Sequence, residues 1–216
     1  MRSSPKPEAG SFAARVRGLG LRCPADIQAF VNSLPYNDRI ECKSPLRVLG
    51  EGTAHCAEGA YFAAAALRAL FGLPPLVVDL AAEEDDDHLL AVYTEGGLWG
   101  AVAKSNTTLL RGRAPVYRSV RELVMSYYDM YFNVLGTMSL RGYSRPADLS
   151  RFDRRGWTDT AGDLEYIGDF LTARRHYPVA PPGFAHAAAD PDLVEACFLK
   201  AKASGLYRPP GVPGKP

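Results

Sequence analysis

The chain has 216 residues, of which 47% are apolar and 23% charged, a composition typical of one or at most two globular domains. Lysine and arginine number 25 against 24 acidic residues, so the formal charge of +1 gives no general attraction to nucleic acid or to an anionic membrane. The longest apolar stretch, residues 60–67, is far shorter than the roughly 20 residues of a membrane span, and no apolar run follows Arg2 and Lys6 as in a signal peptide. We therefore expect a cytoplasmic protein without nucleic-acid or membrane partners.

Four cysteines, at positions 23, 42, 56 and 197, are too few and too scattered for a disulfide scaffold, and no two have CxxC spacing. We expect reduced thiols. Residues 1–10 and 206–216 are rich in proline and glycine and lack apolar periodicity, which predicts two flexible ends. Between them we expect a single domain over residues 11–205.

Three segments precede the first predicted strand. Residues 24–34 carry apolar side chains at helical spacing until Pro35, which predicts a short amphipathic helix. Residues 41–54 contain one proline and two glycines without sustained periodicity, which predicts an irregular loop. Residues 56–71 read CAEGAYFAAAALRALF, an alanine-rich and almost uncharged segment that predicts a buried helix ending at Gly72.

The next segments predict a small antiparallel sheet. Residues 76–80 form a strand-length apolar run, and an acidic run, EEDDD, follows at residues 83–87. Residues 88–93 and 98–104 flank a TEGG turn, which predicts a hairpin that pairs Tyr93 with Leu98. The predicted fold class is α+β, with a central buried helix packed on this sheet. Further helices are predicted at residues 119–132, 163–174 and 191–201, so the extra helices lie toward the C-terminus.

Cys56 is the cysteine whose position favours chemistry. The first turn of a helix stabilises a thiolate through its unsatisfied backbone N–H groups and the helix dipole. His88 follows at the start of the predicted second strand, where a neutral imidazole can take the thiol proton and return it to a leaving amine. These residue types predict a cysteine nucleophile with a histidine base.

The chain resembles the transglutaminase-like superfamily, which has the papain-like fold. The residues that carry the resemblance are the string CAEGAYFAAAALRALFGLPP, followed by DHLLAVY, a GG turn and Trp99, within about residues 50–108. The resemblance implies a catalytic triad of Cys, His and Asp or Asn, and acyl transfer from a carboxamide through a thioester to an amine or to water. It implies no metal or organic cofactor.

The third triad residue is where the sequence departs from the family, which commonly has Asp about four residues after the strand Trp. Here that position is Ala103. Because the predicted hairpin places His88 opposite Ala103, either Ser105 on the same face or Asn106 just beyond the strand can reach the imidazole. We favour Asn106, because an amide oxygen can accept the imidazole N–H, as in papain-like enzymes. The expected catalytic residues are Cys56, His88 and Asn106, with the backbone N–H of Cys56 as the oxyanion donor.

Two other interpretations stay open. A catalytically inactive transglutaminase-like module for protein interaction would keep the fold without needing a thiolate. A zinc site is possible from the residue types alone, but the cysteines and histidines concerned lack the paired spacing of zinc ligands. Those four residues are Cys42, His55, Cys56 and His88. If these residues form no zinc site, we expect His55 to be a loop or rim residue. We expect Glu58 to be a carboxylate that complements the helix dipole.

The substrate class follows from the acidic run at residues 83–87. Five carboxylates next to His88 would favour a basic or neutral peptide, amide or amine substrate over an acidic one. The same run read on its own predicts a solvated loop.

Overall fold

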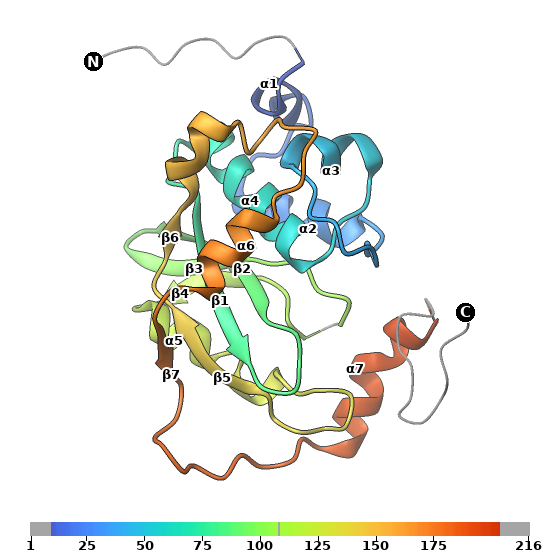
Figure 1. Ribbon diagram of the computed structural model, residues 1–216, viewed down its shortest axis with the longest axis vertical. Helices are drawn as coiled ribbons and strands as arrows, with labels where there is room; N and C mark the ends of the chain where they lie inside the picture. The colour runs from blue at the N-terminus through green and yellow to red at the C-terminus, as the bar shows by residue number, and fades with distance from the viewer. Residues whose placement is uncertain (1–9, 108, 204–216) are drawn as a thin grey trace.

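Within residues 10–107 and 109–203, which the computed structural model describes, seven strands form one antiparallel sheet with helices on both faces (Figure 1). Along the sheet the strands follow the order β4-β3-β2-β1-β5-β7, and β6 pairs with β1 outside this path. The strands are β1 (Leu76–Ala82), β2 (His88–Glu95), β3 (Leu98–Val102), β4 (Arg113–Tyr117), β5 (Leu140–Ser144), β6 (Ala147–Asp148) and β7 (His176–Pro178). The expected α+β class and the strands after the buried helix are therefore confirmed.

The helices agree with the sequence patterns to different degrees. They are α1 (Phe12–Arg17), α2 (Pro24–Ser33), α3 (Pro45–Glu51), α4 (Cys56–Phe71), α5 (Val120–Met125), α6 (Glu165–Thr172) and α7 (Pro191–Ala203). Helix α4 has the predicted bounds, α2 ends one residue earlier than predicted, and α6 and α7 occupy the two predicted C-terminal segments. The pattern did not predict α1, α3 or the strands β4–β7.

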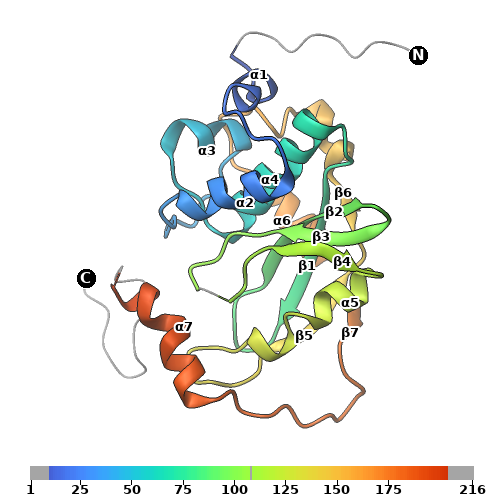
Figure 2. The same cartoon turned by 180° about the vertical axis from the view of Figure 1, so that it is seen from behind.

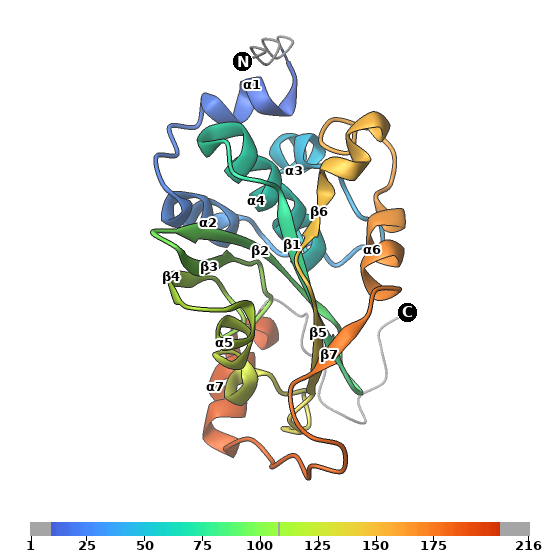
Figure 3. The same ribbon diagram turned by 90° about the vertical axis from the view of Figure 1, so that its left-hand side faces the viewer.

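The two faces of the sheet carry separate hydrophobic cores, and Figure 3 shows α4 and α5 on opposite sides. Leu89, Ala91 and Tyr93 of β2 face the core that contains α4 and α6. Leu90 and Val92 face the core that contains α5. Side chains alternate along a strand, so each residue of β2 belongs to one face only.

Helix α4 is the central element of the first core. Its residues 58–67 are all buried, and Figure 2 shows α1, α2 and α3 around it. A helix without a polar face must be enclosed on all sides, and the alanines let its neighbours approach closely. Gly72 ends it in the left-handed conformation, with φ at 69°, as the sequence predicted.

The segment 41–54 is not the irregular loop that we predicted, because it contains α3. The Ser44 hydroxyl accepts a hydrogen bond from the Arg47 N–H, and Pro45 occupies the first helical position. Gly52 ends the helix with φ at 69°. The proline and the glycine that suggested a loop are thus a start and a stop signal around a helix of two turns.

The hairpin has a different register from the predicted one. Strand β2 continues to Glu95, which pairs with Leu98, and Tyr93 pairs with Gly100. Gly96 and Gly97 both have positive φ, at 57° and 80°, so the two glycines alone form the tight turn. The predicted pairing of Tyr93 with Leu98 was wrong by two residues.

The predicted helix over residues 119–132 is shorter than expected. Helix α5 ends at Met125, and a separate 3-10 helix covers Tyr128–Met130. The Ser126 hydroxyl donates to the Leu123 carbonyl, and this side-chain bond competes with helix continuation. The Ser119 hydroxyl caps the Glu122 N–H as predicted, but the Glu122 carboxylate accepts from the Arg118 N–H, so only half of the capping box forms.

Two expectations concern the ends and the membrane. The ends predicted to be flexible, residues 1–10 and 206–216, lie outside the described residues except for residue 10. No helix in the described part of the chain combines the length and the apolar character needed to cross a membrane.

Gly59 of α4 sets the distance between this helix and the end of β3. A Cβ atom at this position would lie 2.3 Å from Cβ of Lys104. We expect Gly59→Ala to lower the free energy of unfolding by about 1–3 kcal/mol, the usual cost of overpacking. The matched control is Gly50→Ala in α3, where the added methyl group meets no atom within 4 Å and should stabilise by about 0.5–1 kcal/mol. Urea denaturation measures both, and equal effects of the two substitutions would contradict this account.

Candidate active site around Cys56

Cys56 begins α4 and is half-buried at the border of a cavity of about 250 Å³. The cavity lies between α4, β1, the start of β2 and α6. The Cys56 sulfur is 4.0 Å from the carbonyl oxygen of Asp87, and the side chain of Tyr36 lies close to the sulfur. A thiol in this position can meet a bound molecule while its helix keeps it in place.

The environment of Cys56 acts on its ionisation in two directions. Burial raises the pKa of the thiol to about 11. The Ala57 N–H in the first helical turn and the Tyr36 hydroxyl lower this pKa, because both stabilise the thiolate. The free protein therefore holds Cys56 as a thiol at neutral pH, and a reaction at its sulfur requires a group that removes the proton.

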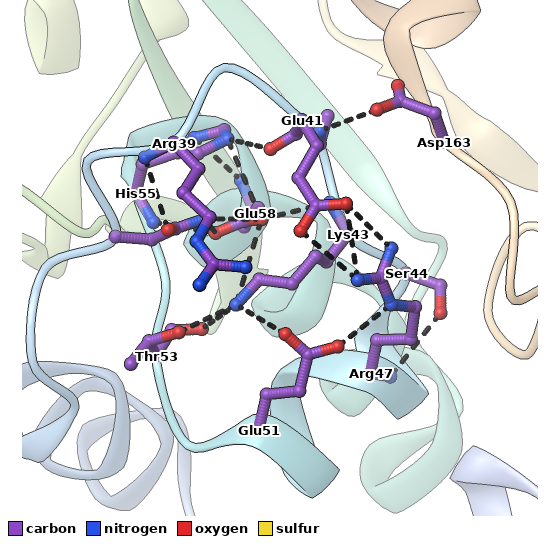
Figure 4. Close-up of polar contacts among 12 residues, drawn as sticks. Arg39, Glu41, Lys43, Ser44, Arg47, Glu51, Thr53, His55, Glu58 and Asp163 are labelled. Carbon is purple, nitrogen blue, oxygen red and sulfur yellow. Dashed lines mark hydrogen bonds and ion pairs between the residues drawn. The ribbon is translucent and has the colours of Figure 1, made fainter.

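A buried carboxylate fixes the helix terminus that carries Cys56, and Figure 4 shows Glu58 at the centre of this polar cluster. The Glu58 side chain is fully buried and accepts hydrogen bonds from the His55 N–H at 2.8 Å and the Lys43 N–H at 2.9 Å. Both of its oxygens also accept from the Asn37 amide. In return, Nδ1 of His55 accepts from the Glu58 N–H at 3.5 Å, which completes a capping box.

Lys43 places a second buried charge in the same cluster. Its side chain is 1% exposed, and its ammonium group lies 4.0 Å from Glu58 and 3.4 Å from Glu51. It also donates to the carbonyl and hydroxyl oxygens of Thr53. The cluster joins the segment before α4 to its first turn, so the position of Cys56 depends on buried ionic contacts.

His55 and Glu58 thus do more than we expected. His55 is the N-cap residue of α4, and its Nε2 lies 3.2 Å from the Glu41 carbonyl oxygen, so it is not a simple rim residue. Glu58 lies in the first turn, as a dipole-complementing carboxylate would, but its burial and its partners make it a structural centre.

The ring of His88 lies on the α5 face of the sheet. His88 alternates with Leu89, and its ring contacts Tyr131 edge-on at 6.4 Å between centroids. Its Nε2 lies 2.9 Å from the Leu110 carbonyl oxygen, an arrangement that leaves Nδ1 as the unprotonated nitrogen of a neutral ring. Burial, with a smaller contribution from Arg113, lowers the His88 pKa to about 4. Among the described residues, no hydrogen bond joins Cys56 and His88. The nearest link between them is the carbonyl oxygen of Asp87, the residue before His88, which lies 4.0 Å from the sulfur.

Ser105 and Asn106, which we expected to orient His88, form no hydrogen bond with its ring among the hydrogen bonds of the described residues. The Ser105 hydroxyl bonds to the Thr107 hydroxyl at 2.9 Å, and Asn106 is partly exposed beside them. The observed hairpin register, extended beyond Ala91 and Val102, places His88 opposite Ser105 and not opposite Ala103. The acceptor at the His88 ring is instead the Leu110 carbonyl, a backbone group that residue types do not reveal.

A buried carboxylate and a buried phenol line the cavity next to Cys56. Asp79 of β1 is 1% exposed, and its Oδ2 lies 3.1 Å from Nε2 of His176. Its Oδ1 has no hydrogen-bond partner among the described residues, and neither has the hydroxyl of fully buried Tyr61. Burial and the nearby Asp87 raise the Asp79 pKa to about 6, although His176 acts to lower it.

The acidic run 83–87 is exposed along its whole length, as expected for a solvated loop, and several of its side chains also bond to the protein. Glu83 forms an ion pair with Arg141 at 2.6 Å, and the Asp85 carboxylate accepts from the Ser139 hydroxyl at 2.6 Å. The Asp87 carboxylate accepts from the Ala82 N–H, and Asp87 also lines the cavity. Within the run, Asp87 is therefore the residue whose position bears on a ligand beside Cys56.

The zinc interpretation gains no support from the geometry. Cys42 and Cys197 are buried, and burial raises the Cys42 pKa, whereas Cys23 is exposed. In the described part of the chain, no three His, Cys, Asp or Glu side chains come together as a metal site would require. His88 in particular has its ring on the α5 face of the sheet, away from the cluster around His55.

Sequence reasoning missed Tyr36, Tyr61, Asp79 and His176. Asp79 carries the clearest signal, because it is a charged residue in the middle of the apolar strand LVVDL. A carboxylate at such a position is buried at a cost and often has a role. The other three come from distant segments, and no spacing rule relates them to Cys56. Comparison of the chain with models of protein families and with curated proteins finds no match.

Proposed function

We propose that the protein is a transglutaminase-like cysteine enzyme that acts on a carboxamide or peptide-like acyl donor through a thioester on Cys56. The order of a cysteine-led buried helix and three antiparallel strands supports the proposal of a papain-like core. The observation that carries the proposal is the half-buried thiol in the first turn of α4, at the border of a cavity, where the Ala57 N–H and the Tyr36 hydroxyl both stabilise its thiolate.

In the proposed reaction, the His88 ring turns from the Leu110 carbonyl toward the sulfur, and the Cys56 sulfur bonds to the acyl carbon while its proton passes to Nδ1 of His88. The carbonyl oxygen becomes an oxyanion, for which the Cys56 N–H and the Tyr36 hydroxyl are the available donors. The intermediate then loses its amine, which takes the proton from His88, and a thioester remains. Water or an acceptor amine attacks the thioester, loses its proton to His88, and regenerates the thiol.

The second candidate is a catalytically inactive module of the same fold. The observation that favours it is the position of the His88 ring, which is held by the Leu110 carbonyl on the face opposite α4. Its low basicity, with a pKa of about 4, also favours this alternative. Such a module needs neither a thiolate nor an acyl intermediate.

Acylation of Cys56 separates the two candidates. We expect p-nitrophenyl acetate to leave one acetyl group on the peptide that contains Cys56, detected by mass spectrometry at pH 8. The Cys56→Ala variant should lose this adduct, and His88→Gln should form it at least tenfold more slowly, because the proton acceptor is removed. Cys23→Ala is the control, since Cys23 is exposed and lies outside the cavity around Cys56.

Alkylation by iodoacetamide gives an independent measurement. Cys56 should react faster than the buried Cys42 and Cys197, and its rate should rise with pH toward the thiol pKa of about 11. If Cys56 reacts no faster than Cys42 and Cys197, and no acetyl group is found on it, the inactive module is the correct function.

A further inference from the structure

Three arginines and three aromatic rings gather between α6 and the 3-10 helix Leu149–Arg155. Figure 3 shows α6 along one side of the molecule. Tyr166 and Phe170 are not among the described residues that line the cavity beside Cys56, so the group lies outside the candidate active site. We name it the arginine–aromatic surface, and its members are Arg151, Phe152, Arg155, Tyr166, Phe170 and Arg174.

The three rings form the base of this surface. Phe152 meets both Tyr166 and Phe170 edge-on, at 5.3 Å between centroids in each pair. All three rings are half-buried and pack against the core that contains α4. Edge-to-face packing on a core fixes the rings, so they give rigid support to a group that stacks on them.

The guanidinium groups lie on these rings. Arg155 is 3.4 Å from the centroid of Tyr166. Phe170 is contacted by two guanidinium groups, at 4.0 Å from Arg151 and 5.3 Å from Arg174. A guanidinium group that stacks on a ring is attracted by its π-electrons and keeps the N–H donors in its own plane for another partner.

These donors have no acceptor within the described part of the chain. No hydrogen bond or ion pair there uses the guanidinium group of Arg151, Arg155 or Arg174. Arg68, in contrast, pairs with Asp153 at 2.8 Å, and the same carboxylate accepts from the Trp157 ring N–H. The three stacked arginines therefore present fixed, planar donors to a binding partner that carries acceptors.

The arrangement also selects the kind of anion. Bases of a nucleic acid would need open ring faces for stacking, but Tyr166 and Phe170 already carry guanidinium groups. A phosphate backbone or an anionic membrane would also meet the exposed carboxylates Glu165 and Asp169 of α6. A short acidic peptide avoids both problems, because it can place separate carboxylates over separate guanidinium groups.

We propose that the arginine–aromatic surface binds an acidic segment of a partner protein. Carboxylates of this segment accept paired N–H bonds from Arg151, Arg155 and Arg174. Because the rings already restrain the three side chains, binding loses less conformational entropy than it would at mobile arginines. This binding needs neither the Cys56 thiol nor its cavity, so it goes beyond the proposed function.

Fluorescence anisotropy of a labelled octapeptide of alternating aspartate and glutamate tests the proposal on the full chain. We expect it to bind at least tenfold more tightly than the matching octapeptide of asparagine and glutamine at pH 7.5. The affinity should fall at least threefold when NaCl is raised from 50 to 300 mM, because salt screens exposed charges.

Variants of the arginines locate the site and show how it binds. Arg151→Gln with Arg155→Gln should weaken binding of the acidic octapeptide at least fivefold. Arg151→Lys with Arg155→Lys keeps both charges but removes the planar donors, so it should weaken binding at least threefold. The matched control is Arg22→Gln with Arg118→Gln, two exposed arginines before α2 and α5, which should change nothing.

Three results would overturn the proposal: equal affinity for the two octapeptides, unchanged affinity in the glutamine variant, or full affinity in the lysine variant. Tighter binding of an oligonucleotide or of phosphatidylserine vesicles than of the acidic octapeptide would also overturn it, since the surface would then serve a nucleic acid or a membrane. Thermal unfolding shows whether each variant is folded, and the lysine variant decides the question if the glutamine variant unfolds.

The measurements are independent of the proposed enzyme. Acetylation of Cys56 by p-nitrophenyl acetate should proceed at the wild-type rate in Arg151→Gln with Arg155→Gln. Peptide binding without acetylation leaves this surface standing and removes the enzyme, and acetylation without peptide binding does the reverse.

Discussion

Glu58→Gln is expected to lower the free energy of unfolding by about 3 kcal/mol, because it removes one charge of a fully buried cluster. The carboxylate accepts four hydrogen bonds, from the backbone of His55 and Lys43 and from the Asn37 amide. A glutamine has one acceptor oxygen, so its NH₂ group would face at least one of these donors. The buried Lys43 ammonium would then lack its fully buried counter-charge.

Urea denaturation at pH 7 measures this effect, and Glu41→Gln is the matched control. The Glu41 side chain is partly exposed and pairs with Arg47 at 3.2 Å, so its loss should cost no more than about 1 kcal/mol. The same variants should differ at Cys56, because Glu58 holds the turn that carries it. We expect a changed rate of iodoacetamide labelling in Glu58→Gln only. Equal stability losses in the two variants would contradict the structural role of Glu58.

His88→Gln is expected to make the protein less sensitive to acid. Burial holds the pKa of His88 at about 4 in the folded protein, against 6.5 for an exposed histidine. As the pH falls from 6.5 to 4, the unfolded chain binds a proton at this position and the folded protein does not. The wild-type protein therefore loses stability across this range, by about 3 kcal/mol from His88 alone.

The measurement compares the free energy of unfolding at pH 7 and pH 4.5 in both proteins. Glutamine can still donate to the Leu110 carbonyl but does not titrate, so its loss between the two pH values should be smaller by about 2–3 kcal/mol. Asp79 has the opposite effect on stability. Because its pKa is raised in the folded protein, protonation of Asp79 at lower pH favours folding. That contribution is common to both proteins and cancels in the difference. Identical pH profiles would show that His88 is accessible to protons in the folded state.

Local signals in the sequence determined much of the fold. The alanine-rich composition and Gly72 predicted α4 and its end, and the apolar runs after Gly72 predicted the first three strands. These predictions succeeded because helix propensity, a glycine stop signal and an apolar run can each be recognised within a short segment. The same signals misassigned α3, where a proline and a glycine mark the two ends of a helix. They also misplaced the hairpin register by two residues. The TEGG sequence can be a four-residue loop between Tyr93 and Leu98 or, as observed, can contain a two-residue turn between Glu95 and Leu98.

The sequence by itself also singled out Cys56 at a helix start, and the structure places it there, on a cavity. Only the tertiary structure decided which groups surround it. Strand alternation turns the His88 ring toward Tyr131, and the packing of β1 against α4 places Asp79 and Tyr61 on the cavity beside the thiol, with His176 of β7 bonded to Asp79. The reason is physical: a residue's type and neighbours fix its local conformation, but its partners across a sheet depend on register and on which distant segment packs against its face.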